Sequence, residues 1–257
     1  MKIVVLGGTG LIGAQVVARL REGGHEAIAA SPSTGVDSIA GTGLDEAFAG
    51  ADAVVDVTNA PAFDEAAVVS FFTTATGNVL AAEKRAGVGH HVALSIVGVD
   101  RDPDAKGYQA GKVAQERLIK EGGVPFTIVR ATQFFEFLAG IADASTVDGV
   151  VRVAPAPMQP IASAAVARAV ADAAVAAPAG AIEVAGPERA PIGEVVSRVL
   201  HAAGDERRVV EDDTVGYFGR EVGKASLVPV GEAIIDELTL DEWLAAQVPT
   251  ASGVAAR

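Results

Sequence analysis

A glycine-rich stretch near the start of the chain constrains the fold more than any other feature. Residues 7–13 read Gly-Gly-Thr-Gly-Leu-Ile-Gly and stand between a short apolar run and an amphipathic run. A strand, a glycine turn and a helix in this order are typical of a dinucleotide-binding unit. Gly7 permits the tight turn, Gly10 lets the backbone approach a pyrophosphate, and Gly13 lets the helix pack on the strand. We therefore predict that this turn binds the phosphates of a nucleotide at the positive end of the helix. The predicted cofactor contacts in the turn are Gly7, Thr9, Gly10, Leu11, Ile12 and Gly13.

The organisation of the remaining chain supports the same fold class. Further strands are expected at 25–30, 53–57, 90–96 and 125–131, with helical segments between them. This alternation predicts an α/β fold with a doubly wound parallel sheet. We expect a dinucleotide-binding domain at 1–157. Residues 158–257 are expected to add an edge strand and a small substrate cap, and not to form an independent domain.

Composition excludes several classes of function. The chain of 257 residues carries 33 acidic against 20 basic residues, and the net charge of −13 disfavours binding to nucleic acid or to anionic membranes. The absence of cysteine excludes disulfides, thiol catalysis and zinc–thiolate sites. His90 and His91 are adjacent on an expected strand and therefore point to opposite faces, so we predict no metal site. No apolar window is long enough to span a membrane, so we expect a soluble protein, and the predicted nucleotide cofactor implies the cytoplasm.

The loop after the second expected strand bears on cofactor preference. In dinucleotide-binding folds an acidic residue here accepts from the ribose 2′-hydroxyl of NAD, whereas a nearby arginine accommodates the 2′-phosphate of NADP. Residues 31–35 contain neither and offer hydroxyl groups, including those of Ser31 and Ser33. Since no carboxylate would repel a phosphate, we predict NADP, with NAD as the alternative. An ordinary proline-containing loop explains the same residues.

Two polar residues follow the third expected strand. Thr58 and Asn59 end an apolar run, and ligands of parallel sheets bind at the carboxyl ends of strands. We predict that they contact the ribose or the nicotinamide side of the cofactor. A simple turn that ends the strand is the alternative.

A second set of residues suggests proton transfer. Tyr108 and Lys112 are four residues apart on an expected helix and share a face, and Ser95 lies near the end of the preceding strand. A nearby ammonium is expected to lower the pKa of the tyrosine, which then exchanges a proton with a carbonyl or hydroxyl oxygen. Ser95 would hold that oxygen, and Lys112 would also bind the nicotinamide ribose. The alternative is a surface Tyr–Lys pair with a serine that closes a strand.

These motifs resemble those of a known family. The glycine stretch at 7–13, the Tyr-Gln-Ala-Gly-Lys spacing at 108–112 and Pro-Phe-Thr-Ile-Val-Arg at 125–130 are similar to the atypical short-chain dehydrogenase/reductases, in particular the NmrA-like, NAD(P)H-binding group. The resemblance implies a Rossmann fold, a nicotinamide cofactor and catalytic places for Ser95, Tyr108 and Lys112. The chain departs from the family by lacking a basic residue after the second strand, and it has Gly-Thr-Gly at 41–43 where the family carries an acid.

The sequence therefore predicts an NAD(P)H-dependent oxidoreductase that transfers hydride to a small apolar or aromatic carbonyl or quinone. The apolar walls of the substrate site are predicted at Phe134, Phe135, Phe137 and Met158, with plain core packing as the alternative. The resemblance leaves two further functions open. One is a redox-sensing regulatory protein that binds NADP without turnover, and the other is the quinone-reducing step of an oxygenation in aromatic polyketide metabolism. We expect a small-molecule substrate and a monomer or homodimer.

Overall fold

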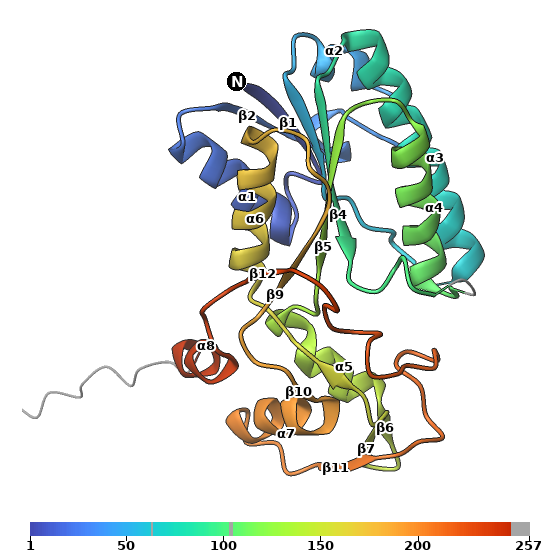
Figure 1. The fold of residues 1–257 in the computed structure, drawn as a ribbon, viewed down its shortest axis with the longest axis vertical. Coiled ribbons are helices and arrows are strands. Elements are labelled where there is room, and N and C mark those ends of the chain that lie inside the picture. Colours follow the sequence, from blue (N-terminus) through green and yellow to red (C-terminus); the bar gives the residue numbers. More distant parts are fainter. Residues whose placement is uncertain (63, 103–104, 248–257) are drawn as a thin grey trace, which may run out of the picture.

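A parallel β-sheet forms the centre of the molecule (Figure 1). The computed structural model describes residues 1–62, 64–102 and 105–247. Within these residues the main sheet has seven strands in the order β12-β9-β5-β4-β3-β1-β2, and each adjacent pair is parallel. The strands are β1 (Lys2–Leu6), β2 (Glu26–Ala30), β3 (Ala53–Asp56), β4 (His90–Ile96), β5 (Phe126–Ala131), β9 (Gly180–Ala185) and β12 (Ile234–Ile235).

Helices cover both faces of this sheet, as Figure 1 shows. On one side lie α1 (Leu11–Glu22) and α6 (Ser163–Val175), and on the other lie α2 (Leu44–Phe48), α3 (Glu65–Ala86) and α4 (Tyr108–Glu121). Successive residues of a strand point to opposite faces, so Ile3 and Val5 join one buried cluster while Val4 and Leu6 join another. The architecture is the predicted doubly wound Rossmann fold.

The strand order places a ligand site at one end of the sheet. The chain runs from β1 outward to β2, then returns to place β3 on the other side of β1. In doubly wound sheets ligands bind beyond the carboxyl ends of the strands at such a reversal. The glycine stretch at 7–13 directly follows β1 and therefore lies at this point.

The chain beyond β5 contributes to the sheet and also forms a small group of elements outside it. It adds β9 and β12 to the sheet, one strand more than expected, and its α6 packs against α1. The elements outside the sheet are η2 (Phe135–Phe137), α5 (Leu138–Ala144), β6 (Thr146–Val147), β7 (Val150–Val153), β8 (Pro157–Met158), β10 (Ala190–Pro191), α7 (Ile192–Ala202), β11 (Arg208–Glu211) and α8 (Leu240–Gln247). The division of the chain at residue 157 stays a prediction.

The proline-rich stretch at 155–160 includes a short strand. Pro157 and Met158 form β8, which pairs antiparallel with β10. A two-residue edge strand tolerates proline because it needs few ladder hydrogen bonds. Among the described residues, no helix combines the length and the apolar character needed to cross a lipid bilayer.

Candidate cofactor and proton-transfer site

The glycine turn has the close contacts that its sequence predicts. Gly7 has a φ of 75°, a left-handed conformation that favours glycine, and its carbonyl accepts from the Gly10 N–H at 2.9 Å. A Cβ added at Gly13 would lie 2.1 Å from the Gly7 oxygen, which is far inside van der Waals contact. Glycine at 13 is thus required for α1 to start where it does.

The N-terminus of α1 is suited to an anion. Its cap residue Gly10 provides no side-chain hydrogen bond, and the first turn contains no acidic residue. Thr9, Gly10 and Leu11 are exposed, whereas Ile12 is buried and has only its backbone to offer. The free N–H groups and the helix dipole together favour a phosphate. The residues present therefore fit the pyrophosphate of a nicotinamide dinucleotide.

The serine loop lies beside this turn, because the N–H of Gly7 donates to the carbonyl of Ala30 at the end of β2. Ser31 is buried, and its hydroxyl lies 2.8 Å from that of the exposed Ser33. The N–H of Ser31 also donates to the hydroxyl of Thr34, so the loop is internally fixed. The two predicted NADP contacts are thus adjacent to one another and to the phosphate site.

The end of β3 lies on the other side of the glycine turn. A Cβ added at Gly7 would meet the Val57 carbonyl at 3.0 Å, so the two turns are in contact. Thr58 donates both its N–H and its hydroxyl to the Asp56 carboxylate, at 2.9 and 2.6 Å. Asn59 is exposed at this edge. Thr58 and Asn59 remain predicted cofactor contacts, with the Thr58 hydroxyl proton directed to Asp56.

Close packing between α3 and α4 determines where the predicted proton-transfer residues lie. A Cβ at Gly111 would meet the Val68 side chain at 2.5 Å, so glycine lets the two helices approach. Tyr108 packs edge-on against Phe72, and the Lys112 ammonium lies 4.3 Å from the centre of the same ring. Tyr108 and Lys112 therefore share one face, as their spacing predicts.

Lys112 is almost completely buried and is held by two hydrogen bonds. Its ammonium donates to the Leu94 carbonyl at 2.8 Å and to the Gln115 side-chain oxygen at 2.7 Å. Burial lowers the pKa of Lys112 to about 8, although the carboxylates of Asp56 and Glu116 act in the opposite direction. An ammonium group has three N–H donors, so one remains for a ligand or for Tyr108.

The expected effect of Lys112 on Tyr108 is not what this structure shows. The sequence predicts that the ammonium lowers the tyrosine pKa, but burial raises the pKa of Tyr108, and the negative charge of Asp56 raises it further. Burial is the larger cause, and Asp56, which the sequence prediction left out, adds a negative charge nearby. A tyrosine with a raised pKa carries its proton at neutral pH but is a weaker acid, so proton donation requires that the tyrosinate be stabilised as it forms.

Ser95 is part of a different network. Its buried hydroxyl donates to Glu116 at 2.8 Å, and Glu116 also accepts two hydrogen bonds from Arg130. Burial would raise the pKa of Glu116, but the bonds from Arg130, Lys120 and Ser95 outweigh it and hold this pKa below its usual value. The structure does not bring the Ser95 hydroxyl into hydrogen-bond contact with Tyr108. Its role as holder of a substrate oxygen stays a prediction.

The predicted apolar walls divide into two groups. Phe135 is buried and packs on Trp243, and Met158 is completely buried, so both belong to the core in this structure. Core packing was the alternative for these two residues, and burial leaves Met158 no surface for a substrate to touch. Phe134 and Phe137 stack with ring centres 5.5 Å apart, and Phe137 is 55% exposed. They remain candidates for a substrate contact beyond the end of β5.

Sequence reasoning missed two residues of the site. Gln115 donates to the Asp56 carboxylate at 3.2 Å and so connects Lys112 to the end of β3. Both residues carry a signal that could have found them. Asp56 is a charge inside an otherwise apolar strand, and Gln115 lies three residues after Lys112 on the same helix face.

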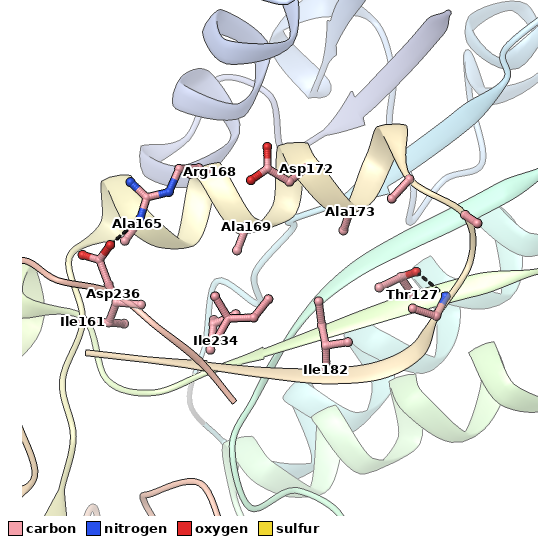
Figure 2. A pocket seen from close by; sticks show the side chains of 14 residues that line it. Thr127, Ile161, Ala165, Arg168, Ala169, Asp172, Ala173, Ile182, Ile234 and Asp236 are labelled. Carbon is pink, nitrogen blue, oxygen red and sulfur yellow. Dashed lines mark hydrogen bonds and ion pairs between the residues drawn. The ribbon is translucent and has the colours of Figure 1, made fainter. Parts of the chain in front are cut away.

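A cavity of about 240 Å³ lies away from this chemistry, between α6 and the edge strands β9 and β12 (Figure 2). Ala165, Ala169 and Ala173 face it from α6, while Ile182 and Ile234 lie across from them. Its lining includes no residue of the glycine turn and neither Tyr108 nor Lys112. The cavity contains none of the groups that the cofactor chemistry needs, whereas the helix terminus and the buried charges favour a ligand site at the carboxyl ends of β1, β3 and β4.

Comparison with known proteins agrees with the geometry. A family model described as NAD(P)H-binding matches residues 7–177, which include the glycine turn and the Tyr108–Lys112 pair. The chain belongs to this NAD(P)H-binding family. The resemblance to the atypical short-chain dehydrogenase/reductases of the NmrA-like group is thereby confirmed.

Individual relatives of this NAD(P)H-binding protein are more distant. A (4-alkanoyl-5-oxo-2,5-dihydrofuran-3-yl)methyl phosphate reductase from Streptomyces griseus is 33% identical over 163 residues, which span 58% of this chain and 54% of that protein. The enzyme WbmH of Bordetella bronchiseptica, solved with NAD+, has a TM-score of 0.73 at 18% identity, covering 95% of this chain and 96% of WbmH. A dTDP-4-dehydrorhamnose reductase of Clostridium acetobutylicum has a TM-score of 0.67 at 16% identity and covers 88% of each chain. The two solved structures show the fold alone.

Proposed function

We propose that this chain is an NAD(P)H-dependent oxidoreductase that reduces a small apolar or aromatic carbonyl or quinone, with Tyr108 as the proton donor. The observation that carries this proposal is the placement of the Tyr108–Lys112 pair. It is connected through Gln115 and Asp56 to the strand end that touches the glycine turn. These contacts support a proposal in which the glycine turn binds the phosphates and Tyr108 transfers the proton at the same end of the sheet.

The chain's own residues define how the reaction would proceed. The cofactor, when bound, supplies the hydride. The backbone of the glycine turn would hold its pyrophosphate, Ser31 and Ser33 its 2′-phosphate, and Thr58, Asn59 and Lys112 its nicotinamide side. Tyr108 would give its hydroxyl proton to the substrate oxygen, and the Lys112 ammonium would stabilise the tyrosinate that remains. Burial and Asp56 raise the pKa of Tyr108, so its hydroxyl carries the proton that a reduction consumes.

The Streptomyces relative supports reduction of a small oxygenated molecule. Its name describes a reductase of a phosphate ester that carries an oxo-dihydrofuran ring and an alkanoyl group. The match covers about half of that protein, so for this chain we infer only the general substrate class. The stacked rings of Phe134 and Phe137 would supply an apolar surface for it.

Steady-state oxidation of NADPH against a panel of aromatic ketones, aldehydes and quinones tests the proposal. We expect turnover with wild type and a fall of about 10² to 10⁴ in kcat for Tyr108→Phe, with NADPH affinity unchanged, because only the proton donor is removed. Lys112→Met should also lose activity, whereas Lys120→Met, which removes a more exposed lysine of the same helix, should keep it. Tight NADPH binding without turnover would instead indicate a redox sensor. Oxygen uptake coupled to quinone reduction would indicate the oxygenation alternative.

A further inference from the structure

The environment of Lys112 includes two residues to which the proposed reaction has so far given no role. Asp56, at the end of β3, is 1% exposed, and Gln115, on α4, is also 1% exposed. Gln115 accepts from the Lys112 ammonium at 2.7 Å and donates to Asp56 at 3.2 Å, so it lies directly between an ammonium and a carboxylate. A buried polar group is costly unless it is paired, and here each of the three satisfies another.

The orientation of Gln115 gives this arrangement a direction. Its side-chain oxygen faces the ammonium and its side-chain nitrogen faces the carboxylate, so the amide dipole is aligned between the two charges. The other oxygen of Asp56 accepts the N–H and the hydroxyl of Thr58, which fixes the carboxylate at the strand end. Thr58 thereby orients Asp56, Asp56 orients Gln115, and Gln115 orients Lys112.

We propose that Asp56 and Gln115 are positioning residues. They keep the buried Lys112 ammonium protonated and orient it for the proton transfer at Tyr108. This inference rests on the proposed function of Tyr108 and Lys112. Asp56 supplies the countercharge, and Gln115 occupies one of the three N–H donors of Lys112 while the Leu94 carbonyl occupies a second. The third N–H of Lys112 can then point in only one direction, so the reacting groups meet this donor in a single geometry.

All packed elements contribute charged groups that a titration must take into account. The titratable groups near the Lys112 ammonium are Glu116 and Tyr108 of α4 and Asp56 of β3. Glu83 of α3 and His91 of β4 form a completely buried pair, 2.7 Å apart, whose titration is influenced by Asp56. Phe72 of α3 contributes only its ring face to Lys112. Asp56 and Glu116 both favour the charged form of Lys112, and burial opposes it.

Direct titration of Lys112 tests the inference without requiring turnover. The chain has six lysines, so 13C labelling at the lysine Cε gives few NMR signals, and Lys112→Met assigns the one of interest. Asp56→Asn should increase the acid dissociation constant of Lys112 at least tenfold, because the countercharge is lost. Gln115→Glu should decrease it, because a carboxylate then contacts the ammonium. Gln15→Leu, which removes a glutamine of α1 that also makes two hydrogen bonds, should leave it unchanged.

Activity gives a second readout with a defined sign. Lys112 is charged below its pKa of about 8 and neutral above it, so kcat should fall as the pH rises through this value. The fall should begin at lower pH in Asp56→Asn and at higher pH in Gln115→Glu. Gln115→Leu should lower kcat about tenfold or more with the substrate KM unchanged, because it disturbs the orientation of the Lys112 ammonium and not substrate binding.

The outcomes separate this inference from the proposed function. If Gln115→Glu and Gln115→Leu, both folded by circular dichroism, leave the Lys112 titration and kcat as in wild type, the inference is overturned. This result is decisive even where Asp56→Asn does not fold. If Tyr108→Phe retains full turnover, the proposed function fails, while the titration of Lys112 still reports whether Asp56 and Gln115 control its charge.

Discussion

The two ends of the candidate site are built in opposite ways. At the glycine turn the proposed contact groups are backbone N–H groups, and the first turn of α1 carries no acidic residue. Thr9, Gly10 and Leu11 of this turn are exposed. Beneath α4, in contrast, charged side chains are buried together: Asp56, Lys112, Glu116 and Arg130 are each at most 6% exposed. One end therefore depends on shape, and the other depends on balanced charges.

This difference determines what each end tolerates. A backbone site accepts most changes of side chain but no added atom where two backbones touch. A buried network of charges accepts small changes of shape, but the loss of one charge leaves its partner unpaired. Substitutions that add a methyl group at one end or neutralise a charge at the other should consequently have different costs.

The largest effect is expected from Arg130→Met. Arg130 and Glu116 pair at 2.6 Å with side chains 7% and 3% exposed, so removing the guanidinium leaves a buried carboxylate and should cost about 3–5 kcal/mol of stability. The matched control is Arg85→Met, which breaks a pair with Asp45 whose side chains are 59% and 62% exposed and should cost about 0–1 kcal/mol. Urea unfolding measures both. Equal losses of unfolding free energy in the two variants would contradict the claim that the buried ion pair matters more for stability than the exposed one.

The next effect is expected at the glycine turn. Gly13→Ala places a Cβ 2.1 Å from the Gly7 oxygen, so α1 must shift. We expect a loss of about 1–3 kcal/mol in stability and a fall in NADPH affinity. In Gly77→Ala, on α3, the added Cβ meets nothing within 4 Å, and this variant should gain up to about 1 kcal/mol. Thermal unfolding and cofactor titration check both, and a Gly13→Ala protein with wild-type NADPH affinity would contradict the backbone account.

Ser95→Ala distinguishes the two networks near α4. Because the Ser95 hydroxyl donates to the buried Glu116, its loss should cost about 1–2 kcal/mol of stability and change kcat less than about threefold. Ser197→Ala removes a hydroxyl that donates to a helix carbonyl and serves as the control for stability. A large loss of kcat in Ser95→Ala with stability unchanged would instead support the predicted role of Ser95 as holder of the substrate oxygen.

The smallest effect concerns cofactor preference. Ser33→Asp adds a carboxylate at the proposed 2′-phosphate contact, where like charges should cost about 1 kcal/mol, or roughly a fivefold loss of NADPH affinity. NADH affinity should change little. Ser70→Asp adds the same charge on the exposed face of α3 and controls for net charge. Unchanged NADPH affinity in Ser33→Asp would mean that this loop does not contact the 2′ position.

These contrasts also explain what the sequence could predict. The fold and the glycine turn follow from local patterns, since strand, turn and helix lie within two dozen residues and Gly13 meets Gly7 six positions earlier. The Tyr108–Lys112 pair is likewise local, because helix geometry fixes its shared face. The partners of Lys112 and Ser95 are not local. Asp56 is 59 residues from Gln115, and Glu116 is 21 residues from Ser95, so only the packing of α3 and α4 on the sheet reveals them.

The central claim is that the glycine turn and Tyr108 serve one reduction. Transfer of deuterium from NADPH labelled at both hydrogens of its nicotinamide C4 to the best carbonyl of the panel, followed by mass spectrometry, tests it most directly. The account predicts an alcohol product that carries one deuterium with wild type. Tyr108→Phe should form that product at least about a hundredfold more slowly, at an unchanged NADPH affinity. NADPH consumption that leaves no deuterium in the alcohol, or an equal rate in Tyr108→Phe, would contradict it.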